Sequence, residues 1–130
     1  MPIAGSFRER EINEPPAPLA FEPGTAWQYG IGIDWTGKLI ETVSNMTLED
    51  YFQKYILKPL GMNDTSFVLP SQKFDRLVTG YTRQPDGTLK QNQRVQPEPP
   101  KLFLGGGGLY STAADYVHFM QMILGRGTRR

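Results

Sequence analysis

The sequence predicts a mainly α-helical protein with minor β structure (class α+β), on three observations. Apolar residues recur at intervals of three and four in three separate segments, which is the spacing of one helix face. Two of these segments open with a threonine placed three residues before an aspartate, a signal for a helix start. A Pro-Asp-Gly turn at residues 85–87 stands between short alternating runs and predicts one hairpin.

Length and composition suit one small domain, or a piece of a larger one. The chain has 130 residues, of which 38% are hydrophobic, with 14 glycines and 11 prolines. Its net charge of +1, without a basic stripe, argues against nucleic-acid and membrane partners. The chain has no cysteine and a single histidine, which excludes disulfides, thiolate nucleophiles and cysteine- or histidine-rich metal sites. We therefore expect no metal and no cofactor.

Signals for a membrane or for export are not found in the sequence. No run of about 18 apolar residues occurs, so no membrane span is expected. The first ten residues, MPIAGSFRER, lack the apolar core of a signal peptide. A cytoplasmic location is the resulting expectation.

Composition divides the chain into three parts. Residues 1–22 are polar and broken by prolines, which favours an extended proline-rich arm. Residues 23–125 contain all three helical patterns and a hairpin near 77–90, and predict a single helical domain. Residues 126–130 form a small basic tail with three arginines.

The first helix is predicted over residues 33–46. Its apolar face would consist of Trp35, Leu39, Val43 and Met46. Gly37 lies inside the pattern and costs about 1 kcal/mol relative to alanine in a helix. Such a glycine often marks a close contact with another backbone.

The second helix is predicted to begin at Thr47, which would cap it together with Asp50. The apolar face that follows is made of Leu48, Tyr51, Phe52, Tyr55 and Ile56. Pro59 and Gly61 are expected to end the helix.

The third helix is predicted after a run of four glycines, Gly105 to Gly108. Thr112 and Asp115 repeat the capping signal, and Gly125 is a suitable C-terminal stop. The apolar face is made of Tyr116, Phe119, Met120, Ile123 and Leu124.

The usual catalytic patterns are not met. A Ser-His-Asp triad needs a histidine, and His118 lies within a helix, where a partly exposed structural role is the better interpretation. The glycine run lacks the lysine of a phosphate-binding loop, and a tight approach of two chain segments explains it better. Four helical carboxylates are expected to face water, without the apolar setting of a general acid. They are Asp34, Glu41, Glu49 and Asp50.

Tyr29 lies between a turn and the first helix. A tyrosine acts as a base only where nearby cations favour its deprotonation. On the residues alone, Tyr29 is best interpreted as an ordinary aromatic residue packed beside Trp27.

Several sequence motifs, in order, resemble the serine β-lactamase and penicillin-binding-protein-like superfamily. One is FEPGTAWQYGIGIDWTGKLIETVSNMTLEDYFQKYILKPLGMNDTSF, with its PGT-x-W-x-Y, PLGM and DT-x-F elements. The other is LGGGGLYSTAADYVHFMQMIL, which is similar to the family's GGGL-x-S-T-x-x-D stretch. The likeness covers about residues 19–124 and favours the class C-type lactamases, the lactamase-type carboxylesterases and the fungal acyltransferases. It implies the helical region of a β-lactamase/transpeptidase-like fold, a central part that lacks most of the sheet.

The resemblance also implies a chemistry, acyl transfer through a serine ester. In the family, the serine of Ser-x-x-Lys attacks a carbonyl, and the lysine and the tyrosine of Tyr-x-Asn move the proton. Tyr29 stands at the tyrosine position and would act as base toward the serine and as acid toward the leaving group. Ile31, Gly106 and Gly107 would line or support the bound substrate, a small-molecule ester or acyl compound.

Two departures from the family pattern modify this expectation. Ile31 stands where lactamases carry asparagine, and it cannot make that residue's polar contacts, which favours esters over penicillins. None of the five serines has a lysine three residues later, and the third family motif, of Lys-Thr-Gly type, is not found. The sequence therefore predicts a fragment or shortened member of the lactamase-like serine hydrolases that is inactive alone.

Two alternatives remain open. The chain could be a non-catalytic helical module that binds a partner, or pairs with itself, through apolar helix faces. It could also be half of a split enzyme, completed by a second polypeptide that carries Ser-x-x-Lys.

Overall fold

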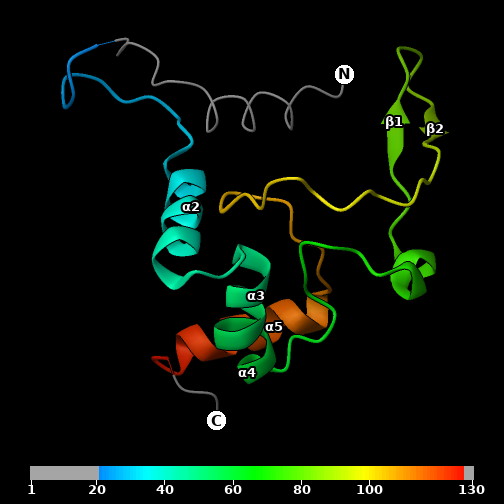
Figure 1. Ribbon diagram of the computed structural model, residues 1–130. Helices are drawn as coiled ribbons and strands as arrows, with labels where there is room; N and C mark the ends of the chain where they lie inside the picture. Colours follow the sequence, from blue (N-terminus) through cyan, green and yellow to red (C-terminus); the bar gives the residue numbers. More distant parts are fainter. Residues whose placement is uncertain (1–20, 128–130) are drawn as a thin grey trace.

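The computed structural model describes residues 21–127, which form a small helical body and one β hairpin (Figure 1). The elements are α2 (Gly32–Ser44), α3 (Leu48–Phe52), the π-helical turn η1 (Gln53–Leu57), α4 (Lys58–Leu60), the 3-10 turn η2 (Ser71–Arg76), β1 (Tyr81–Arg83), β2 (Leu89–Gln91) and α5 (Ala113–Leu124). The expected class, mainly α with minor β, is confirmed. The predicted arm and basic tail lie outside the described residues except at 21–22 and 126–127.

Helix α2 presents its apolar residues to solvent and its polar side to the protein. Asp34 and Gly37 are its buried residues, whereas Leu39 and Val43 are 60% and 74% exposed. The helix ends where Asn45 adopts a left-handed conformation with φ of 53°, so Met46 lies beyond it. The predicted apolar stripe therefore exists, but the described residues leave its middle, Leu39 and Val43, mostly exposed.

The second helix begins as predicted and continues further than expected. The Thr47 hydroxyl accepts a 3.0 Å hydrogen bond from the Asp50 N–H group. The helical path then runs through Pro59 to Leu60, so the expectation that Pro59 helps to end it is wrong. Pro59 has no N–H group, and in α geometry its ring would meet the carbonyl of Tyr55. The chain widens into η1 just before it, where the Lys58 N–H bonds the Gln53 carbonyl.

The hydrophobic core is small and lies where this helix meets α5. Leu57, Leu60 and Met62 form its buried centre. The partly buried side chains packed around it are Phe52, Ile56, Phe119 and Met122. Leu48 and Phe67 are also buried.

Helix α5 starts as predicted but packs with a different face. The Thr112 hydroxyl accepts a hydrogen bond from the Asp115 N–H group at 3.2 Å, which confirms the cap. Phe119 is the one residue of the predicted face that joins the core, together with Met122. The others, Tyr116, Met120, Ile123 and Leu124, are exposed. The expectation that these five residues form the packing face is therefore wrong.

The hairpin stands apart from the helices (Figure 1). Strands β1 and β2 pair antiparallel, with Thr82 opposite Lys90. The turn closes through a hydrogen bond from the Gly87 N–H to the Gln84 carbonyl, and Gly87 has φ of 86°. Every residue of both strands is exposed, so the hairpin adds no core.

Two of the acidic side chains expected to face water instead bind backbone amides. Glu41 accepts a 2.9 Å hydrogen bond from the Leu48 N–H, and Glu49 accepts one of 2.6 Å from the Phe67 N–H. Both side chains are partly buried, whereas Asp50 is exposed as expected. Each carboxylate thus connects its own helix to a segment outside that helix. An uncharged acceptor in the same place would bind the amide more weakly.

The cap at Thr47 gives a first testable prediction. Replacement of Thr47 by alanine is expected to lower the free energy of unfolding by about 1 kcal/mol, because the Asp50 N–H would lose its acceptor. Urea unfolding followed by circular dichroism measures this loss. Thr42→Ala is the matched control, since the Thr42 hydroxyl only bonds the Lys38 carbonyl within α2. An equal loss in both variants would contradict the capping role.

Candidate active site

Tyr29 lies in the exposed segment that leads into α2. Its side chain is 73% exposed and makes no hydrogen bond or ion pair with another described residue. Ile31 is partly buried and occupies the position just before the helix. Its carbonyl accepts hydrogen bonds from the N–H groups of Asp34 and Trp35, at 2.9 and 3.1 Å. The backbone two residues after Tyr29 is therefore held by the first turn of α2.

The glycine run contacts this same turn. The Gly106 N–H donates a 2.8 Å hydrogen bond to the Asp34 carboxylate. A Cβ atom on Gly105 would lie 2.3 Å from the carbonyl oxygen of Ile33, a distance that no side chain tolerates. One on Gly37 would lie 3.2 Å from the Gly105 nitrogen. The tight approach expected at the glycine run, and the close backbone contact expected at Gly37, are both confirmed.

Asp34 is the main correction to the sequence analysis. We expected this carboxylate to face water, but it is 2% exposed. The reason is that the helix face carrying Asp34 meets backbone without side chains, whose N–H group needs an acceptor. The two partners are 72 residues apart in the sequence. No local pattern could have paired them, although an acid in the first helical turn and a later glycine run are each visible.

The predicted site residues therefore come from two segments that meet at the start of α2. Tyr29 and Ile31 precede the helix, and the glycine run lies along its first two turns. In Figure 1 the gold segment that ends in the glycine run passes beside α2. The backbone of Gly106 is fixed by Asp34, and Gly107 follows it, exposed, with its N–H bonded to the Leu104 carbonyl at 3.3 Å.

His118 is separate from this arrangement. It lies in the middle of α5, partly exposed, with a buried Nδ1 atom that has no hydrogen-bond partner among the described residues. No group of three or more acidic or histidine side chains in residues 21–127 is placed to hold a metal ion.

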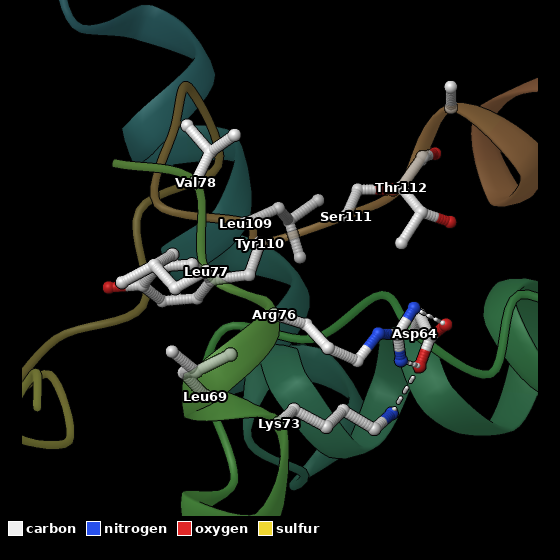
Figure 2. A pocket seen from close by; sticks show the side chains of 11 residues that line it. Asp64, Leu69, Lys73, Arg76, Leu77, Val78, Leu109, Tyr110, Ser111 and Thr112 are labelled. Carbon is white, nitrogen blue, oxygen red and sulfur yellow. Dashed lines mark hydrogen bonds and ion pairs between the residues drawn. The ribbon is translucent and has the colours of Figure 1, made fainter. Parts of the chain in front are cut away.

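Apart from the junction at α2, a cluster of charged side chains lines a groove of about 480 Å³ between η2 and the start of α5 (Figure 2). Arg76 binds Asp64 through two hydrogen bonds of 2.7 and 2.8 Å, and Lys73 lies 2.9 Å from the same carboxylate. Both cations point to Asp64, while apolar side chains such as Val78 and Leu109 line the opposite wall (Figure 2). Asp115 holds the Asp64 backbone, accepting a 2.7 Å hydrogen bond from its N–H. The cluster thus attaches η2 to the segment that follows α4 and contributes Met62 to the core.

Asp64 gives a prediction for the pH dependence of stability. Hydrogen bonds from Arg76 and then Lys73 hold the pKa of the Asp64 carboxyl well below its usual range. A lowered folded-state pKa adds stability above the unfolded-state pKa of about 3.9, and this contribution is lost as the pH falls toward the folded-state value. Arg76→Gln should therefore lower the urea midpoint of unfolding near pH 7. The difference in midpoint between this variant and the unmodified chain should become smaller below about pH 4.

Arg83→Gln is the control, because Arg83 bonds only a backbone carbonyl in the exposed hairpin. The urea midpoint of Arg83→Gln should differ little from that of the unmodified chain, by an amount that does not depend on pH. If Arg76→Gln lowers the urea midpoint equally at neutral and acid pH, the role given to the ion pair between Arg76 and Asp64 is wrong.

The family of the chain follows from comparison with known proteins. A family model described as Beta-lactamase matches residues 14–130. The chain belongs to the β-lactamase family. The resemblance drawn from the tyrosine and glycine motifs is thereby confirmed.

Relatives of this β-lactamase-family chain include proteins named as an esterase and as a methylbutanoyltransferase. Lovastatin esterase of Penicillium rubens is 36% identical over 118 residues, which cover 82% of this chain and 28% of the esterase. Monacolin J acid methylbutanoyltransferase of Aspergillus terreus is 32% identical over 114 residues, which cover 84% of this chain and 27% of that enzyme.

Solved structures agree with this assignment. A mutant of simvastatin synthase from Aspergillus terreus has a TM-score of 0.76 and 34% identity, over 85% of this chain and 28% of the synthase. A penicillin binding protein from Bacillus halodurans has a TM-score of 0.61 and 25% identity, over 88% of this chain and 35% of that protein. The chain thus spans between a quarter and about a third of the length of these relatives, as expected for a part of the family fold. In residues 21–127, no helix is both long enough and apolar enough to cross a membrane.

Proposed function

We propose that this chain carries the tyrosine-bearing part of a serine acyl hydrolase or acyltransferase that acts on small-molecule esters. The observation that supports this most is the meeting of two family motifs at the start of α2, joined by the Asp34–Gly106 hydrogen bond. Tyr29 would transfer the proton between the attacking serine and the leaving group. An exposed phenol in a segment held by the helix suits this role, since it can reach a substrate without competing partners.

The substrate class is proposed from two further facts. The relatives that the chain resembles are named as an esterase and a methylbutanoyltransferase, whose names describe ester cleavage and acyl transfer. Ile31 would contact the substrate with an apolar side chain, which favours an ester over a β-lactam that carries an amide group. Gly106 and Gly107 would support the substrate with backbone that no side chain covers.

The 130 residues alone are expected to show no acyl-enzyme chemistry, because no serine in them has a lysine three residues later. A fluorophosphonate probe and a p-nitrophenyl butyrate assay test this on the purified chain. Serine labelling together with ester turnover would overturn the expectation.

The function itself is tested in a chimera. Residues 21–127 would replace the matching segment of the Penicillium rubens lovastatin esterase, so that the esterase supplies the remainder of the fold. We expect turnover of p-nitrophenyl butyrate and little turnover of the β-lactam nitrocefin. A chimera that folds, as judged by its cooperative melting, but hydrolyses neither compound or prefers nitrocefin would refute the proposal.

A second candidate function is a non-catalytic interaction module. It is supported by the exposed apolar faces of α2 and α5, where Leu39, Val43 and Leu124 are each at least 60% exposed. Such faces favour association, including homo-oligomers. Size-exclusion chromatography with light scattering should then give a dimer that Leu39→Glu with Val43→Glu dissociates. A monomer at all concentrations would refute this candidate.

The remaining proposals concern location and other partners. A cytoplasmic location and the lack of nucleic-acid partners are proposed from the sequence alone, the second of them from its near-neutral charge. Cell fractionation and a nucleic-acid gel-shift assay test them.

A further inference from the structure

We infer that Asp34 is a positioning residue, whose buried carboxylate holds the backbone of Gly106 and Gly107 in register with the segment that carries Tyr29. This inference rests on the proposed function, because it assigns a task within the same site. It adds a residue that neither the family motifs nor the sequence pattern marked.

A short series of hydrogen bonds connects the two segments. The Ile31 carbonyl accepts from the Asp34 N–H at 2.9 Å, and the Asp34 carboxylate accepts from the Gly106 N–H at 2.8 Å. Two hydrogen bonds, both made by Asp34, thus join the backbone two residues after Tyr29 to the backbone of the glycine run. Because only these two hydrogen bonds separate the Ile31 backbone from the Gly106 backbone, a displacement of one segment would also displace the other.

Steric contacts restrict the same junction. Gly105 lies against the Ile33 carbonyl so closely that an added Cβ would stand 2.3 Å from its oxygen. A Cβ on Gly106 would lie 3.0 Å from the Asp34 carboxylate. The close packing therefore limits how the glycine run can lie against α2, and Asp34 supplies the directional contact between them.

The charge of Asp34 suits its place. The residue lies in the first turn of the 13-residue helix α2, where the helix dipole favours a negative charge. A hydrogen bond to an ionised acceptor is shorter and about twice as strong as a neutral one. A buried acid can thus hold the amide of Gly106 more firmly than a neutral side chain or water could.

The first experiment measures the contact directly in the 130-residue chain. Amide hydrogen exchange by NMR should show the Gly106 N–H exchanging roughly tenfold to a hundredfold faster in Asp34→Ala, the range expected on loss of a charge-assisted bond. Asp34→Asn keeps a neutral oxygen acceptor in the same place and should recover only part of the protection. Glu41→Ala is the matched control, because Glu41 also lies on α2 and also binds a backbone amide, that of Leu48. It should leave Gly106 exchange unchanged.

The second experiment separates positioning from stability in the esterase chimera. Asp34→Ala is expected to lower kcat roughly tenfold to a hundredfold with a smaller change in KM, because misplaced groups slow the chemical step. Asp34→Asn should restore part of kcat, because it keeps an acceptor without the charge. Glu41→Ala should leave kcat within about twofold of the parent, whatever its effect on melting.

The outcomes distinguish this inference from the proposed function. Unchanged Gly106 exchange in Asp34→Ala, or equal loss of kcat in Asp34→Ala and Glu41→Ala, would overturn the positioning role alone. Full activity of a Tyr29→Phe chimera would overturn the proposed function, whereas the exchange result at Gly106 would still stand or fall by itself.

Discussion

Tyr29→Phe is expected to lower kcat of the esterase chimera by about 10²–10⁴-fold, the usual contribution of a positioned general acid and base. The substitution removes one hydroxyl group and keeps the ring. Because the Tyr29 side chain makes no hydrogen bond with another described residue, the loss should occur without a change in thermal stability. Steady-state kinetics with p-nitrophenyl butyrate, together with a melting curve of each variant, measure both quantities.

Tyr81→Phe provides the matched control. Tyr81 is also an exposed tyrosine, but it lies in strand β1 of the hairpin, away from α2. Removal of the Tyr81 hydroxyl group should leave kcat within about twofold of the parent chimera. If Tyr29→Phe keeps the activity of the parent chimera, Tyr29 is an ordinary aromatic residue and the proposed role is wrong.

Gly105→Ala is expected to lower the free energy of unfolding by about 3 kcal/mol, at the upper end of the usual cost of overpacking. The added Cβ would stand 2.3 Å from the Ile33 carbonyl oxygen, and this oxygen belongs to helix backbone that cannot rotate away. The glycine run would have to leave α2, which would also break the Asp34–Gly106 hydrogen bond. Urea unfolding of the 130-residue chain measures the change.

Gly32→Ala is the control for the same junction. Gly32 begins α2, and a Cβ there would meet no atom within 4 Å. Alanine should stabilise the helix by about 0.5–1 kcal/mol, because it loses less conformational freedom than glycine. A Gly105→Ala variant as stable as Gly32→Ala would mean that the glycine run is not held against the helix.

The sequence predicted the helices and their starts well, because these signals are local. A threonine followed three residues later by an aspartate is complete within one turn, and both caps are present at Thr47 and Thr112. The close contact at Gly37 was also predictable, since glycine destabilises a helix interior and is favoured there mainly where another backbone comes close.

The packing faces were harder to predict, because periodicity finds an apolar face without showing what covers it. The stripe of Leu39 and Val43 is real, yet it is exposed in the 130 residues. On α5 the core is met by Phe119 and Met122, so only one residue of the predicted stripe takes part. The family relatives are three to four times as long as the matched segment, which fits faces that are apolar without local partners.

The buried carboxylates were invisible to the sequence analysis for a different reason. An acid on a helix is usually solvated, and the exceptions depend on partners far along the chain. Asp34 and Asp115 bind amides 72 and 51 residues away. The path through Pro59 was missed because a single π turn allows a proline that α geometry would reject.

Four contacts between buried or partly buried carboxylates and backbone amides also affect how this protein can vary. Asp34, Glu41, Glu49 and Asp115 each accept a hydrogen bond from a main-chain N–H group. Every residue except proline offers that group, so these contacts place almost no demand on the identity of the donor residue. The constraint falls on the acid alone. A mutational scan should therefore find asymmetric tolerance across each contact, with the acid restricted and its partner limited by packing and by the exclusion of proline.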